Sequence, residues 1–171
     1  MDNLVGCIDA IRSEPMAVAL MSGKGESELS FFTEVDGVLL KSRLDYVPPK
    51  SVVNGLVDIK KVQEGNAERE SFIELAVRRG YHRQAAAYLD AYNYWFPMDQ
   101  REHFIFIVVE EQAPHLVNVI PMGPNTIEAG REINRRRRAL YKQCRDTDIW
   151  PGYPVIMSPI EARPYLLERE F

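Results

Sequence analysis

Three charged side chains, Asp45, Asp58 and Lys60, have the types and spacing of a metal-assisted catalytic site. Asp58 and Lys60 are two positions apart in an apolar segment, and such residues of a β-strand project from the same face. Asp45 ends the preceding predicted strand, so we expect it to lie across from Asp58. Two carboxylates suit a hard cation such as Mg²⁺ (or Mn²⁺), which prefers oxygen ligands. With Lys60 steadying charge on a nearby phosphate, the set predicts phosphodiester hydrolysis.

The Asp-x-Lys triplet by itself is common, and in isolation it is typical of an exposed strand end with solvated charges. A later segment favours the chemical interpretation. Gln84 and Tyr88 are four residues apart in a helix-like stretch, so they share one helix face. The small residues at 85–87 would let that helix pack closely against a sheet.

Apolar periodicity predicts the elements that must position these residues. The predicted helices cover 4–21, bent at Pro15, then 69–79, 81–94 and 128–144. The predicted strands are a hairpin over 29–46, a third strand that follows the Asn54–Gly55 turn and ends near Lys60, and a second hairpin over 104–109 and 116–120. We therefore predict an α/β (α+β) fold, with a central mixed β-sheet flanked by helices, in a single domain over residues 1–171. The segment from Trp150 onward is predicted to pack irregularly.

Composition sets broad limits on the class of protein. The chain has 171 residues, 46% hydrophobic and 27% charged, which fits one domain with a substantial core. No apolar stretch approaches the roughly 20 residues of a membrane helix and no signal peptide is visible, so we expect a soluble, cytoplasmic protein. Cys7 and Cys144 are expected to be reduced thiols. A net charge of −4 neither supports nor excludes DNA as a ligand.

Three groups of residues, taken in order, resemble the motifs of PD-(D/E)XK nucleases of the RecB and RecE types. They are the segments 41–45, 57–60 and 80–88, and the likeness extends to Glu14–Pro15, the stretch 25–30 and the late segment 150–153. The closest likeness is to the nuclease domain of exodeoxyribonuclease VIII and its phage relatives. The resemblance implies a restriction-endonuclease-like core.

The resemblance also implies roles for particular residues. Asp45 and Asp58 would be metal ligands, Lys60 the catalytic lysine, and Gln84 and Tyr88 the polar positions of a Gln-x-x-x-Tyr helix. Glu28 would match an upstream acidic residue that assists metal binding. An equally weighted alternative for Glu28 is a solvated turn between a helix and a strand.

The activity implied is that of a Mg²⁺-dependent exonuclease acting on double-stranded DNA ends in phage-type recombination or repair. The resemblance further implies a homo-oligomer, a single-strand annealing recombinase as partner, and the cytoplasm of a bacterium or phage-infected host as location. The main alternative is a catalytically inactive PD-(D/E)XK-fold module for DNA binding or assembly. An iron–sulfur nuclease sharing the Gln-x-x-x-Tyr helix is disfavoured, because two cysteines cannot supply four thiolates.

One departure from the family concerns histidine. Relatives often carry a histidine in an N-terminal helix, whereas His82, His103 and His115 all follow Asp58. The chain is then either a shortened form or one in which that histidine is dispensable. For His82, a packing or surface role is favoured over a role in the site.

Two further clusters have open interpretations. A basic stripe on the last helix would face phosphates, or else form a solvated helix face balanced by nearby glutamates. Its members are Arg131, Arg135, Arg138 and Lys142. The aromatic residues between 92 and 96 would either stack on DNA bases or, as is more usual, belong to the core.

Overall fold

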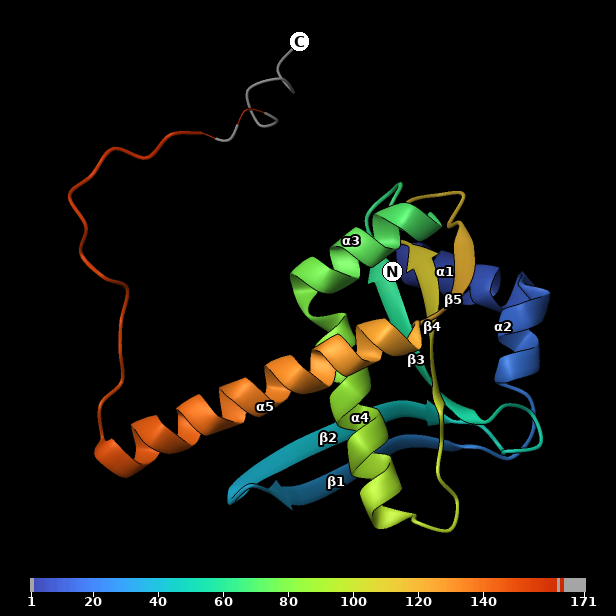
Figure 1. Ribbon diagram of the computed structural model, residues 1–171. Helices are drawn as coiled ribbons and strands as arrows, with labels where there is room; N and C mark the ends of the chain where they lie inside the picture. The colour runs from blue at the N-terminus through green and yellow to red at the C-terminus, as the bar shows by residue number, and fades with distance from the viewer. Residues whose placement is uncertain (1, 163, 165–171) are drawn as a thin grey trace.

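A five-stranded mixed sheet forms the centre of the computed structural model, which describes residues 2–162 and 164 (Figure 1). The strands are ordered as in the sequence, β1 to β5, and only β3 and β4 are parallel. The strands are β1 (Glu26–Val35), β2 (Val38–Val47), β3 (Gly55–Val62), β4 (His103–Glu110) and β5 (Val117–Pro121). The predicted α/β (α+β) class with a mixed sheet is confirmed.

Helices cover both faces of this sheet. The helices are α1 (Asp2–Ser13), α2 (Pro15–Leu20), α3 (Arg69–Arg79), α4 (Tyr81–Trp95) and α5 (Pro124–Thr147). One core cluster joins α3, α4 and the start of α5 to the sheet, and a second joins α1 and α2 to the opposite face. Among the described residues, no helix is both long enough and apolar enough to span a membrane.

The predicted element boundaries mostly agree with the structure. The N-terminal helix is divided before Pro15, as predicted, because proline fixes its own φ and restricts the residue before it. The last helix begins at Pro124, four residues before the predicted start, since proline is well tolerated in a first helical turn. Beyond Trp150 the described residues up to 162 form no regular element, as expected, but they are all exposed, so the predicted packing of this segment is wrong.

Two glycines fix how the last three helices meet. Gly80 has a φ of 79°, a left-handed conformation that glycine adopts without a steric penalty, and it separates α3 from α4. Gly130 lies on α5 where a side chain would collide with the backbone carbonyl of His82. The absence of a side chain therefore lets α5 cross closely over α4 (Figure 1).

The hairpin of β1 and β2 and the neighbouring strand diverge near the predicted site. β2 and β3 are paired at Tyr46 and Val57 alone among the described residues. In a regular strand, residues three positions apart point to opposite faces. Leu44 and Val47 of β2 both join the core under α4, so the alternation of faces is interrupted between them. This change of face leaves a gap between β2 and β3 at Asp45.

Candidate active site

Asp45 lies in the gap between β2 and β3. The pairing of Tyr46 with Val57 in antiparallel strands places Asp45 opposite Asp58 in the register. The Asp45 Oδ2 atom accepts a hydrogen bond of 3.0 Å from the backbone amide of Ile59. The carboxylate thus takes the place of a backbone carbonyl in the sheet, and its other oxygen makes no hydrogen bond with any described residue.

Asp58 is a buried carboxylate, with 1% of its surface exposed. Its Oδ1 atom accepts a hydrogen bond of 2.9 Å from Gln84 Nε2, which reaches it from α4. Its Oδ2 atom lies 2.6 Å from Lys60 Nζ. The ammonium is not aligned with Oδ2 as a hydrogen-bond donor would be, so the contact is described as an ion pair among the described residues. The ammonium of Lys60 is therefore the cation that this buried oxygen contacts in the described chain.

Burial dominates the electrostatics of Asp58. It raises the pKa of this carboxyl from 3.8 to about 6, because the charged form loses its hydration. The nearby charge of Asp45 raises the pKa too, whereas Lys60 and Gln84 lower it. The two carboxylates therefore repel each other across the gap, a repulsion that a divalent cation would relieve.

Lys60 is held over aromatic rings. Its ammonium lies 4.8 Å from the centroid of the Tyr81 ring and 6.0 Å from that of Phe106. Tyr81 begins α4 directly after Gly80, so the joint between α3 and α4 sets the position of this ring. The contacts with the rings and with Asp58 fix the lysine head beside the carboxylates.

The Gln-x-x-x-Tyr pair occupies one face of α4, as predicted. Gln84 bonds Asp58 directly. Tyr88, one turn later, is partly buried and packs 6.3 Å from the ring of Phe104, measured between centroids. Asp45, Asp58, Lys60 and Gln84 are thus brought together, with Tyr88 one helical turn away.

Glu28 does not lie in the solvated turn that was the alternative interpretation for it. It lies within β1 rather than in a turn, with a φ of 56°, and the register puts it opposite Asp45. Its exposed carboxylate forms an ion pair with Arg43 of β2, and this contact raises the pKa of the arginine. Among residues 2–162 and 164, no group of three or more acidic, histidine or cysteine side chains is arranged to hold a metal. Metal binding by Glu28 remains a prediction.

The histidines lie away from these carboxylates. His82 is buried, and its Nδ1 atom lies 3.5 Å from the backbone carbonyl of Ala76, which agrees with the favoured packing role. His115 packs against Gly6 and lies 3.7 Å from the sulfur of Cys7. His103 begins β4, where the backbone of Gly55 packs against it.

Two residues near the site were missed by sequence reasoning. Arg43 pairs with Glu28 and stands two positions before Asp45 on β2. Tyr81 provides the ring beneath Lys60. The sequence did contain an indication of a role for Tyr81, because it is three positions before Gln84 and therefore close to the same helix face.

A buried Asp-x-Lys pair on a mixed sheet, with a second aspartate across from it and a glutamine reaching down from a helix, defines a PD-(D/E)XK-like core. The chain belongs to the family described as "PDDEXK-like domain of unknown function (DUF3799)", whose model matches residues 1–155. No curated protein matches the chain.

A solved structure shares this fold. It is a crystal structure from Eubacterium rectale described as "Putative exonuclease", with a TM-score of 0.72 and 15% sequence identity. The match covers 99% of this chain and 65% of that one, so the protein spans about two thirds of its structural relative. At this identity the likeness shows the fold alone.

Proposed function

We propose that this protein is a metal-dependent nuclease, an exonuclease that hydrolyses phosphodiester bonds at the ends of double-stranded DNA. The observation that carries the proposal is the position of Asp45 opposite Asp58, with Lys60 Nζ 2.6 Å from the Asp58 carboxylate. Membership of a PDDEXK-like family supports the nuclease class. The exonuclease assignment draws on the resemblance to exodeoxyribonuclease VIII and on the description given to the Eubacterium rectale protein.

The residues present fit a divalent cation. Asp58 Oδ2 is buried and contacts the Lys60 ammonium at 2.6 Å, a cation whose place a metal ion could take, and Asp45 has one oxygen that is not engaged by the described chain. Mg²⁺ is commonly held by one or two carboxylates together with waters and substrate phosphates, so two aspartates suffice for Mg²⁺ (or Mn²⁺). When bound, the ion would polarise a phosphoryl oxygen and lower the pKa of water.

The remaining side chains would act on the substrate and on the ligands. Lys60 Nζ, free to contact a phosphate once Asp58 is otherwise engaged, would stabilise negative charge that develops on the phosphoryl oxygens. Gln84 holds Asp58 in one orientation through its 2.9 Å hydrogen bond. Tyr88 would border the path of the DNA strand one turn further along α4.

The biological setting is proposed from the resemblance alone. It comprises phage-type recombination or repair in the cytoplasm of a bacterium or infected host, a homo-oligomeric enzyme, and a single-strand annealing recombinase as partner. Relatives of exodeoxyribonuclease VIII provide this context, and the chain's own residues are compatible with it.

The test compares wild type with Lys60→Ala on linear duplex DNA in Mg²⁺. Release of nucleotides by the wild type and its loss in the variant is the expected result. A closed circular duplex of the same sequence should remain intact, because it offers no end. Equal hydrolysis by both proteins, or none by either, would contradict the nuclease assignment, and cleavage of the circle would replace exonuclease with endonuclease.

A catalytically inactive DNA-binding or assembly module is the second candidate. The Lys60–Asp58 ion pair favours it, since such a pair neutralises a buried carboxylate without a metal. Titration with Mg²⁺, followed by calorimetry, separates the two functions. If the protein is a scaffold, wild type and Asp45→Asn should bind Mg²⁺ equally weakly. If it is the proposed nuclease, wild type should bind Mg²⁺ measurably more tightly than Asp45→Asn does.

A further inference from the structure

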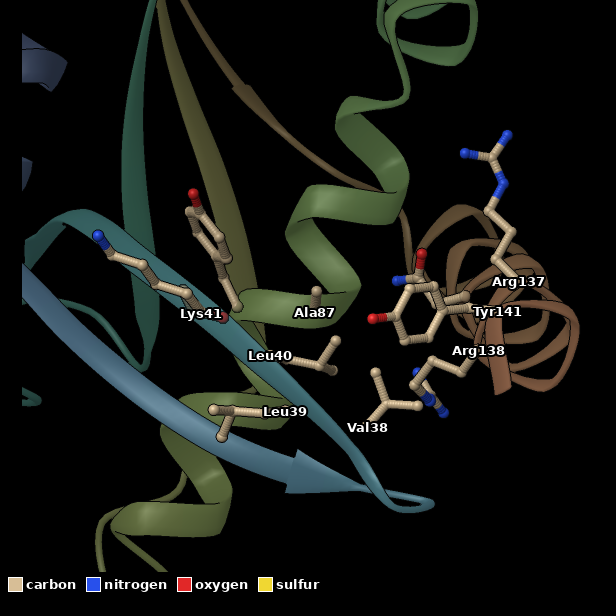
Figure 2. A pocket seen from close by; sticks show the side chains of 11 residues that line it. Val38, Leu39, Leu40, Lys41, Ala87, Arg137, Arg138 and Tyr141 are labelled. Atoms are coloured by element: carbon tan, nitrogen blue, oxygen red, sulfur yellow. The ribbon is translucent and has the colours of Figure 1, made fainter. Parts of the chain in front are cut away.

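A groove lies between β2, α4 and α5, next to the candidate active site (Figure 2). Its volume is about 510 Å³. We name it the α5 groove. Its floor is formed by Leu40 and Ala87, and its walls include Tyr88, Arg137 and Tyr141. Figure 2 shows Tyr141 reaching from α5 toward Ala87 and Leu40, whereas the charged end of Arg137 extends away from these three residues.

The α5 groove and the candidate active site share one helix, α4. Tyr88 lines the groove, and Gln84, one turn earlier on the same helix face, bonds Asp58. A chain leaving the two aspartates along α4 would therefore pass Tyr88 and enter the groove.

The charges on α5 distinguish the groove from the rest of that helix. Three arginines of the predicted basic stripe are engaged by acidic side chains: Arg131 by Asp90 and Glu128, Arg135 by Glu132, and Arg138 by Asp36. For these three the alternative of a balanced, solvated helix face agrees with the structure. Arg137, outside the predicted stripe, is exposed and forms no ion pair or hydrogen bond with the part of the chain described. Its charge is available to an anion at the groove's rim.

Tyr141 supplies an aromatic surface beside this charge. The residue is 46% exposed although it lines the groove, and its ring also meets that of Trp150, with 5.8 Å between the centroids. A cationic rim next to an exposed ring is the combination that binds single-stranded nucleic acid, because phosphates contact the cation and bases stack on the ring.

We propose that the α5 groove binds a single DNA strand, with a phosphate at Arg137 and a base stacked on Tyr141. This inference rests on the proposed function and specifies the form of substrate that lies next to the catalytic residues. A volume of 510 Å³ is typical of pockets for small ligands. It accommodates a base with its phosphate and is too small to enclose a double helix.

The test measures binding in the presence of a chelator, so that hydrolysis cannot contribute. The probe is a short labelled single-stranded oligonucleotide, compared with a blunt-ended duplex of the same composition by fluorescence anisotropy. We expect Tyr141→Ala to weaken single-strand binding by at least about fivefold, and Tyr141→Phe to retain it, because stacking needs only the ring. Arg137→Gln should lower the slope of log affinity against log salt by about 0.7, the loss of one phosphate contact.

Arg136→Gln is the matched control. Arg136 is the neighbouring residue on α5, is equally exposed, and pairs with Glu132 at 2.6 Å. Its variant should leave both the affinity and the salt slope unchanged. Thermal unfolding of each variant monitors folding, and Arg137→Gln, a change at an exposed residue, remains the deciding readout if Tyr141→Ala unfolds.

Two results would overturn the inference: single-strand affinity that is unchanged in both groove variants, or an equal loss of affinity for the single strand and the blunt duplex. Failure of the proposed function has a different signature. If the wild type binds single strands through Arg137 and Tyr141 but never hydrolyses DNA, the nuclease assignment fails while the groove stands.

Discussion

Gln84 donates a hydrogen bond of 2.9 Å to Asp58, and so joins the helix face of α4 to the buried carboxylate of β3. The bond orients Asp58 and also helps to lower its pKa against the larger effect of burial. In metal centres, partners that orient a ligand affect affinity and activity nearly as much as the ligand does.

Gln84→Leu should therefore reduce Mg²⁺ affinity or nuclease activity by about 10- to 100-fold. Leucine is close in size but cannot donate, so Asp58 loses its orienting partner. Calorimetric titration and a DNA hydrolysis assay measure the effect. The control is Gln143→Leu on the exposed surface of α5, which should change neither quantity. Full activity in Gln84→Leu would remove Gln84 from the site.

Asp45 has a structural and a chemical role that two substitutions separate. Asp45→Asn keeps an oxygen to accept the amide hydrogen of Ile59, so the fold should retain its stability while metal binding is lost. Asp45→Ala leaves that amide without its partner and should lower the free energy of unfolding by about 1–3 kcal/mol. Chemical denaturation and Mg²⁺ titration provide the two readouts. Equal stability of the Asn and Ala variants would contradict the structural role.

The stability of the metal-free protein should depend on the protonation of Asp58. Its pKa is raised from 3.8 to about 6, so the folded state holds the proton more tightly than the unfolded chain does. The contribution of the protonated Asp58 to the free energy of unfolding is therefore complete below pH 3.8 and is lost as the pH rises through 6. The free energy of unfolding should fall across this window by an amount on the order of 3 kcal/mol.

Urea denaturation of wild type and Asp58→Asn, in chelator and at several pH values between 4 and 7, measures this effect. The informative quantity is the difference between the two proteins at each pH, because other titrating groups are common to both. A difference that stays constant over the window would show that Asp58 titrates normally.

Gly130→Ala should loosen the packing of α5 on α4. A Cβ at this position would meet the carbonyl oxygen and carbon of His82, which belong to rigid helix backbone. We expect a loss of about 1–3 kcal/mol in the free energy of unfolding, together with weaker binding in the α5 groove. At Gly152, a Cβ would meet nothing within 4 Å, so Gly152→Ala is the control. A Gly130→Ala protein as stable as the control would contradict this close packing.

Much of the local structure was predictable from the sequence, because it depends on short-range patterns. The hairpin turn at Asp36–Gly37, the break before Pro15 and the joint at Gly80 follow from backbone preferences of individual residues. The spacing of Asp58 and Lys60 likewise fixed their common face, and the spacing of Gln84 and Tyr88 fixed theirs.

The sequence could not determine which charges are neutralised. The spacing on α5 left Arg131, Arg135 and Arg138 open as phosphate contacts or as a solvated helix face, and each meets an acidic side chain in the structure. Two of the partners, Asp90 and Asp36, come from α4 and from the β1–β2 turn, far away in the chain. Arg137, which no pattern singled out, is left to line the groove.

By itself the sequence determined the types and the order of the proposed catalytic residues, and which of them share a face, because strand and helix periodicity act over a few positions. The tertiary structure alone decided that β2 and β3 separate beside Asp45, that Gln84 reaches Asp58, and that Glu28 turns to Arg43. These outcomes depend on side chains packed from distant segments. The pairing of charges and the burial of a carboxylate are set by that packing, and neither is encoded in local spacing.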